Sequence, residues 1–130
     1  MAFKKFICGF TDDLDAKIED TPKIIFGDHT RVLKFVNFSF ARGADGTQIL
    51  STNTKRVPQH LFYQMLSSID LSSYGYARHF KFLKQQRLIL PEESISEKFE
   101  VVAKSMYQQI ANNQKQNQEL TELRDWLLPM

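Results

Sequence analysis

Apolar positions in the last third of the chain follow a helical repeat from Ser94 to Leu128. They recur with the alternating spacing of three and four residues that places side chains along one side of a helix. At 1.5 Å per residue the predicted helix is roughly 50 Å long, and Pro129 would end it. We call this side the heptad seam, and it consists of Ile95, Phe99, Val102, Met106, Gln109, Asn113, Gln116, Leu120, Leu123 and Leu127.

The heptad seam is apolar at both ends and polar in the middle. Because so long a helix cannot bury its whole seam on the small body that precedes it, the pattern predicts pairing with a second helix. In the alternative interpretation, the N-terminal half of the seam packs on its own domain. Ser94 and Glu97 have the spacing of a capping box, which predicts that the helix begins at Ser94. The residues expected to pair are Phe99, Val102, Met106, Asn113, Leu120, Leu123 and Leu127.

The residues before this helix predict short strands and short helices. Gly27 to His29 would form a tight turn between two strands, and a short helix is expected over residues 80–86. A helix from Pro58 to Ile69 would bury one face, formed by Leu61, Met65 and Ile69. Strand-type composition and period-two alternation predict extended segments at residues 3–10, 23–26, 31–40, 47–50 and 87–90. The expected fold class is α/β (α+β), with a body at residues 1–91 and a long helix at residues 92–130.

Composition places few limits on function. With 42% apolar and 25% charged residues in a chain of 130, the sequence is typical of a soluble globular protein. It has no apolar run of the roughly 20 residues that span a membrane and no signal-peptide pattern, so a cytoplasmic location without membrane partners is expected. Cys8 is the single cysteine, which excludes an internal disulfide and a thiolate metal site.

The charges divide the chain into three parts. Residues 23–90 carry ten basic and only three acidic residues, whereas the segments on either side are acidic. A basic surface of this kind attracts polyanions, and nucleic acid is the first candidate. The alternative is that these side chains only form a solvated basic face.

No catalytic, metal or cofactor site is expected. The sequence contains no GxSxG and no HxxxH, and its three histidines lie in different predicted elements. Asp28 and His29 are adjacent, so their side chains would point apart and would not form the oriented base of a hydrolase.

Two clusters of polar and basic residues are better suited to binding DNA. Arginine can donate two parallel hydrogen bonds to guanine, lysine can contact phosphate, and a glycine lets the backbone approach closely. In the alternative interpretation, Arg31 pairs with Asp28 across its own turn, while Tyr74, Tyr76 and Phe80 close the core. The candidate DNA-binding residues are His29, Thr30 and Arg31 in the first cluster, and Tyr74, Gly75, Tyr76, Arg78, His79 and Lys81 in the second.

These clusters resemble parts of a known family. The runs at residues 24–31 (IIFGDHTR), 43–46 (GADG) and 75–84 (GYARHFKFLK) resemble the target recognition domain of type I restriction-modification specificity subunits. Residues 114–130 (QKQNQELTELRDWLLPM) are similar to the spacer helix that follows such a domain. The resemblance covers residues 22–130, and the order of the segments makes it more specific than any one of them.

The resemblance implies a noncatalytic subunit that reads half of a bipartite site in double-stranded DNA, while methyltransferase and restriction subunits carry out the chemistry. It also implies a twisted-sheet recognition domain whose spacer helix pairs antiparallel with a second one. This chain has one predicted spacer helix and part of one recognition domain. We therefore expect a fragment or a half-length subunit that forms a homodimer through its spacer helices. The competing hypothesis is a helix-mediated assembly protein with no specific DNA readout.

Overall fold

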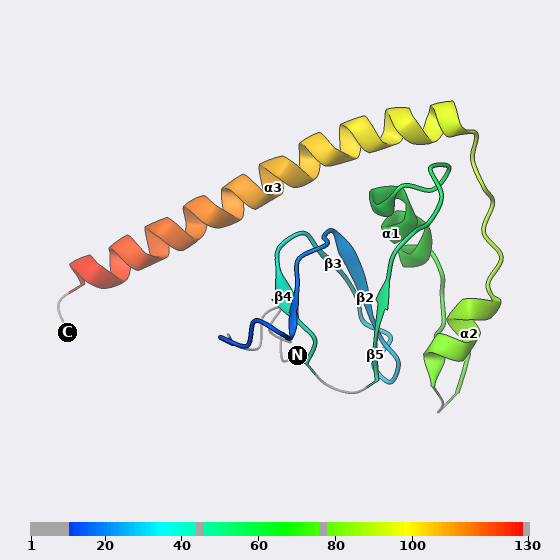
Figure 1. Ribbon diagram of the computed structural model, residues 1–130, viewed down its shortest axis with the longest axis horizontal. Helices are drawn as coiled ribbons and strands as arrows, with labels where there is room; N and C mark the ends of the chain where they lie inside the picture. Colours follow the sequence, from blue (N-terminus) through cyan, green and yellow to red (C-terminus); the bar gives the residue numbers. More distant parts are fainter. Residues whose placement is uncertain (1–10, 44–45, 76–77, 129–130) are drawn as a thin grey trace. The chain divides into compact units, whose positions relative to one another are not determined.

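The computed structural model describes residues 11–43, 46–75 and 78–128. The fold is α+β, as predicted, with five short strands and three helices among the described residues (Figure 1). The predicted strand at residues 3–10 lies outside the described residues. In chain order the elements are β1 (Lys17–Ile18), β2 (Lys23–Gly27), β3 (Leu33–Val36), β4 (Phe40–Ala41), β5 (Thr47–Leu50), α1 (Gln59–Ser67), α2 (His79–Gln85) and α3 (Glu93–Leu127).

The chain forms two compact units, and each contains two separate segments. Unit 1 comprises residues 1–51 and 70–86, and unit 2 comprises residues 52–69 and 87–130. This division differs from the predicted boundary between residues 91 and 92, because α1 groups with the long helix α3 rather than with the strands.

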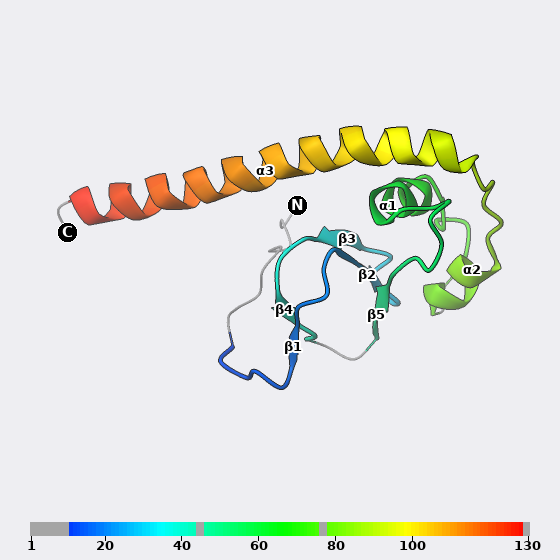
Figure 2. The same cartoon turned by 45° about the horizontal axis from the view of Figure 1, so that its top comes forward.

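Unit 1 is built on a three-stranded antiparallel sheet. Its strand order is β3-β2-β5, with Ile25 opposite Lys34 on one side and Ile49 on the other (Figure 2). Ile24 and Phe26 are buried on one face of β2, which is the alternation expected of a strand with one covered face. The strands predicted at residues 23–26 and 47–50 are therefore confirmed, and the strand predicted from its period-two pattern to start at residue 31 begins at Leu33.

A second, two-stranded ribbon in unit 1 was not predicted. Lys17 and Ile18 of β1 pair with Ala41 and Phe40 of β4. The expected extension of the preceding strand to residue 40 is wrong, because β3 ends at Val36 and β4 pairs with a different partner. A strand of two residues leaves too little alternation in the sequence to be recognised.

Unit 2 is formed by α1 and the N-terminal part of α3, which lie side by side (Figure 1). His60 and Leu66 of α1 are buried, whereas the predicted face of Leu61, Met65 and Ile69 is only half-buried. On α3 the buried residues are Ser96 and Ala103. The hydroxyl of Ser96 donates a 2.5 Å hydrogen bond to the carbonyl of Arg56, so this small side chain allows close approach of the chain to the helix.

The predicted capping box at the start of α3 is wrong. The helix begins at Glu93, its N-cap is Glu92, and no side chain caps it. The carbonyl of Glu92 accepts the amide of Ser96 at 3.1 Å, so Ser94 already lies inside the first turn.

The predicted strand at residues 87–90 is also wrong. This segment pairs with no strand among the described residues. The guanidinium of Arg56 instead donates to the carbonyls of Pro91 and Leu90, at 3.0 and 3.4 Å. The Arg56 side chain therefore binds the last carbonyl of the segment, that of Leu90, and the first carbonyl after it, that of Pro91. In a strand, such acceptors would receive backbone hydrogen bonds from a neighbouring strand.

Helix α3 contacts its own unit with a different side from the heptad seam. The side covered in unit 2 includes Ser96, Glu100, Ala103 and Tyr107. The alternative that Phe99, Val102 and Met106 pack on their own domain is wrong, since their exposed fractions are 37%, 55% and 62%.

None of the helices in the described part of the chain is long and apolar enough to cross a membrane.

Side-chain hydrogen bonds support the polar middle of α3. They join residues four apart: Gln108 to Asn112, Gln109 to Asn113, and Gln118 to Glu122. Such pairs stabilise a helix by about 0.2–0.5 kcal/mol each. The helix can therefore continue through a sequence that offers few apolar residues.

Candidate nucleic-acid interface

The β2–β3 hairpin ends in a tight turn that presents the first predicted cluster. The amide of Gly27 donates to the carbonyl of Val32, and the amide of Arg31 donates to the carbonyl of Gly27, both at 2.9 Å. A Cβ atom at residue 27 would collide with Oγ1 of Thr30, so a larger residue there would force the Thr30 side chain to move. The predicted turn at residues 27–29 is therefore present and extends to Arg31.

Asp28 joins this turn to the start of α2, where the second predicted cluster lies. Its carboxylate accepts the amide of Phe80 at 2.8 Å, and its carbonyl accepts the amide of His79 at 2.9 Å. These are the first two amides of α2, which have no intrahelical partner, and Arg78 at the N-cap supplies no side-chain acceptor. Asp28, which is only 5% exposed, therefore brings together two clusters about fifty residues apart in the sequence.

The backbone amide of Asp28 makes a further contact, with the segment that precedes β5. Its amide donates to the carbonyl of Gly46 at 2.9 Å, just before β5. Gly46 has a φ of 82°, a conformation that favours glycine. The amide of Asp28 thus binds the segment before β5, while its carbonyl and its carboxylate both bind the start of α2.

Arg31 does not pair with Asp28, so that alternative is wrong. One Nη1 hydrogen bond of its guanidinium goes to the carbonyl of Leu71, at 3.4 Å. Hydrogen bonds from the side chain and backbone amide of Ser72 lower the pKa of Asp70, and the charge of Arg31 adds to this effect. Arg31 therefore extends from the hairpin to the loop that precedes α2.

Aromatic residues in and around the second cluster pack against one another and against β2. Tyr74 stacks on Phe82 with ring centroids 4.2 Å apart, and Phe80 contacts Phe26 of β2 at 6.2 Å. Both Tyr74 and Phe80 are half-buried, so they contribute to the packing of unit 1 as the alternative interpretation expected. The ammonium of Lys84 lies 5.0 Å from the centroid of the Phe80 ring, where a cation is attracted by the aromatic face.

Most of the predicted DNA-binding residues are exposed, but His79 is not. Its side chain is buried, and its Nδ1 atom has no hydrogen-bond partner among the described residues. Its ring therefore does not form part of the surface, and Tyr76 lies outside the described residues. We define the recognition surface as the exposed residues of the two joined clusters together with Lys84: His29, Thr30, Arg31, Gly75, Arg78, Lys81 and Lys84.

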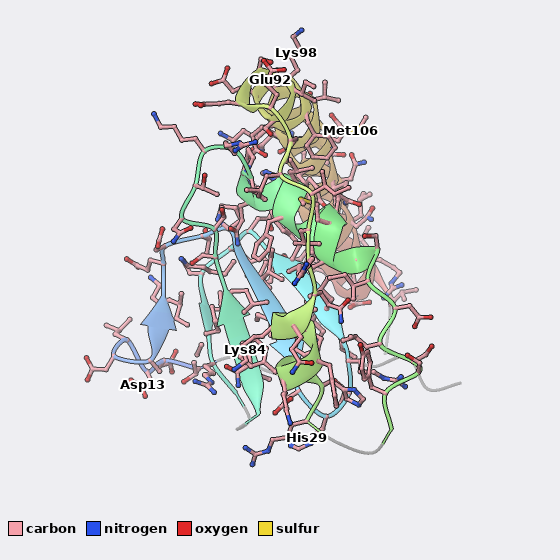
Figure 3. The ribbon with its side chains drawn as sticks, turned by 90° about the vertical axis from the view of Figure 1, so that its right-hand side faces the viewer. Asp13, His29, Lys84, Glu92, Lys98 and Met106 are labelled. Carbon is pink, nitrogen blue, oxygen red and sulfur yellow. The ribbon has the colours of Figure 1, made fainter. Side chains whose placement is uncertain are left out.

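The recognition surface is positively charged. In Figure 3 His29 lies at the tip of the β2–β3 hairpin and Lys84 lies on α2. Arg31, Arg78, Lys81 and Lys84 supply four positive charges. Asp28 is buried, and one oxygen of its carboxylate accepts the amide of Phe80. The chemistry available here is hydrogen-bond donation and attraction of anions.

The sequence analysis missed the structural role of Asp28 and the position of Lys84. An aspartate at a turn is usually explained by hydrogen bonds to its own neighbours, and nothing local in the sequence indicates that it caps a helix 52 residues away. Lys84 could have been found, since it lies three residues after Lys81 and shares its side of a short helix.

A second candidate surface is the heptad seam of α3. Ile95, Leu120, Leu123 and Leu127 are all more than half exposed. Single exposed apolar residues need no explanation, but apolar residues repeated along one side of a helix, here on both sides of a polar middle, form a row that indicates a site for a partner. Met106, which belongs to this row, is labelled on α3 in Figure 3.

No group of three histidine, cysteine, aspartate or glutamate side chains that could hold a metal ion occurs within residues 11–43, 46–75 and 78–128. A scan against protein-family models gave no match, and searches of the curated proteins and of the solved structures gave none either. Function has therefore to be inferred from the residues of the chain itself.

Proposed function

We propose that the chain is a noncatalytic DNA-recognition module of the kind found in type I restriction-modification specificity subunits. The observation that carries the proposal is the double contact of Asp28 with the amides of His79 and Phe80. Through this contact, two basic segments far apart in the sequence form one recognition surface. A surface assembled from separate loops on a sheet is the usual way in which a rigid scaffold presents binding residues.

The residues of this surface suit the two kinds of contact that a DNA-binding protein makes. Exposed lysine and arginine side chains on α2 and its N-cap would contact phosphates and position the protein. Polar side chains at the hairpin tip would approach base edges in a groove, because a two-stranded hairpin is narrow enough to enter the major groove. Such a module acts where DNA lies, which for a bacterial system is the cytoplasm.

The heptad seam would supply the second half of the assembly. In this proposal α3 pairs with a second spacer helix, from another copy or another chain, and the two recognition surfaces then read the two halves of a bipartite site. Methyltransferase and restriction subunits would bind the paired helices and carry out the chemistry. The polar residues Gln109, Asn113 and Gln116 would fix the register of the pair at some cost in stability.

A second candidate function is assembly alone. The observation that favours it is the exposure of the heptad seam, which would be the same if α3 only joined copies of the chain. In that case the recognition surface is a solvated basic face, and any duplex binding is weak and disappears as salt rises.

The two functions differ in the effect of removing charge from the recognition surface. We expect replacement of Arg78 and Lys81 by alanine to weaken binding to duplex DNA roughly tenfold, and to lower the slope of log affinity against log salt by about two. Fluorescence anisotropy of a labelled duplex, titrated at several salt concentrations, measures both quantities.

A matched control removes the same charge from elsewhere in unit 1. Lys17 of β1 and Arg42, which follows β4, lie on the two-stranded ribbon and are replaced by alanine together. The proposal expects the control to bind almost as well as the unchanged chain. If both double variants lose affinity equally, duplex binding depends on net charge alone, and assembly becomes the better interpretation.

A further inference from the structure

The backbone of Arg31 adopts an uncommon conformation at the hairpin tip. Its φ of 59° makes it the only non-glycine residue with a positive φ in the described part of the chain. Glycine would adopt this conformation without a steric cost, whereas a residue with a Cβ is disfavoured there. A strained residue at an exposed turn is often retained for what its side chain does.

The side chain of Arg31 is also held in place. Its backbone amide is bound to the carbonyl of Gly27, and its Nη1 atom donates to the carbonyl of Leu71. One such bond uses one of the five N–H donors of a guanidinium and leaves others for a ligand. The side chain thus loses part of its rotamer freedom before any ligand binds, which lowers the entropy cost of a directed contact.

We infer that Arg31 is the base-reading residue of the recognition surface and that it recognises guanine, while Arg78 and Lys81 contact phosphates. Guanine presents two acceptors, O6 and N7, in the major groove, and the parallel donors of a guanidinium match both. Reading a base edge requires a restricted direction of approach, to which the hydrogen bond from Arg31 to the carbonyl of Leu71 contributes. Contact with phosphate requires only charge and reach. This inference rests on the proposed function, because it presupposes that the surface binds duplex DNA.

The competing explanation is that Arg31 only fastens the hairpin to the loop at Leu71. Two substitutions separate the explanations. Arg31→Gly removes the side chain but relieves the backbone conformation, so the turn is expected to remain folded. Arg31→Lys keeps the charge but lacks the two parallel donors.

The test is selection of duplexes from a randomised pool by the full chain and by each variant, followed by sequencing of the bound fraction. We expect the unchanged chain to favour guanine at one position by roughly 5-fold to 150-fold over other bases. Arg31→Gly is expected to lose that preference, and Arg31→Lys, whose ammonium can still donate to guanine without the parallel geometry, is expected to weaken it, while other positions keep theirs. Arg42→Ala is the control, since it removes an exposed arginine of unit 1 outside the recognition surface.

The outcomes distinguish this inference from the function on which it rests. A guanine preference that survives in Arg31→Gly overturns the role of Arg31, as does a selected site without guanine, and an undiminished preference in Arg31→Lys overturns the contact through two parallel donors. If the unchanged chain selects no sequence at all, the proposed function fails, and the role of Arg31 fails with it.

Discussion

Replacing Leu120 and Leu123 by glutamate is expected to convert an associated form of the chain into a monomer. Both leucines lie on the heptad seam, and their exposed fractions are 62% and 51%. A pair of helices would bury four such leucines, and burying a leucine side chain fully is worth about 1.5–3 kcal/mol. Since these side chains are partly covered already, we expect a loss on the order of 5 kcal/mol in association free energy, or more than a thousandfold in Kd.

Analytical ultracentrifugation of the chain over a range of concentrations measures this change. The control introduces the same two negative charges on other sides of α3, by replacing Gln108 and Gln114 with glutamate, and should leave association intact. A dimer that persists in the leucine variant would show that the heptad seam is not the contact. An unchanged chain that stays monomeric at every concentration would mean that the seam binds only a helix of a different protein.

Replacing Asp28 by alanine is expected to loosen α2 from the sheet. The substitution leaves the amide of Phe80 without its acceptor in a half-buried position. An unsatisfied buried donor costs about 1–3 kcal/mol, and removing a negative charge from a helix N-terminus costs a further 0.3–1 kcal/mol or so. We therefore expect the free energy of unfolding to fall by about 2 kcal/mol, as measured by urea denaturation of the chain.

Asp28→Asn is the matched control, because it keeps an oxygen that can accept the amide of Phe80 but removes the charge. It should lose only a fraction of the stability that the alanine variant loses. Hydrogen exchange at the amides of His79 and Phe80 gives a local readout, and faster exchange is expected in the alanine variant. Unchanged stability and unchanged exchange would contradict the role of Asp28 as the residue that joins the hairpin to α2.

The parts of the fold that the sequence predicts well are those with a strong local pattern. The short apolar run of Ile24, Ile25 and Phe26 identifies β2, and the glycine of the following turn marks where the chain reverses. The long repeat in α3 predicts the extent of this helix to within one residue at each end, because the pattern is sustained over many turns. Leu120, Leu123 and Leu127, which follow the spacing of this repeat, are all exposed.

The parts that the sequence does not predict depend on tertiary contacts. Ser94 has the spacing of a cap, but the helix starts one residue earlier and buries Ser96 instead, because the hydroxyl of Ser96 reaches the carbonyl of Arg56. His60 is buried on α1, 2.6 Å from the carboxylate of Glu100. These contacts join residues 40 apart, which no local pattern reveals.

The candidate site likewise has features that the sequence predicts and features that depend on tertiary contacts. The two clusters of basic and aromatic residues are recognisable from their composition, but only the contacts of Asp28 show that they lie together. The burial of His79 could not have been anticipated either, because it follows from the docking of α2 on Asp28. Residue type therefore identifies the candidate donors, and the three-dimensional contacts decide which of them reach the surface.

We propose that the recognition surface distinguishes DNA sequences. This is tested by the anisotropy of a randomised duplex pool titrated with the chain at low and at high salt, repeated with the duplexes that stay bound at high salt. We expect a subset of duplexes to bind more tightly and to withstand salt that releases the rest, since base contacts depend less on salt than phosphate contacts do. Loss of all binding together as salt rises would contradict it and would leave assembly through α3 as the function.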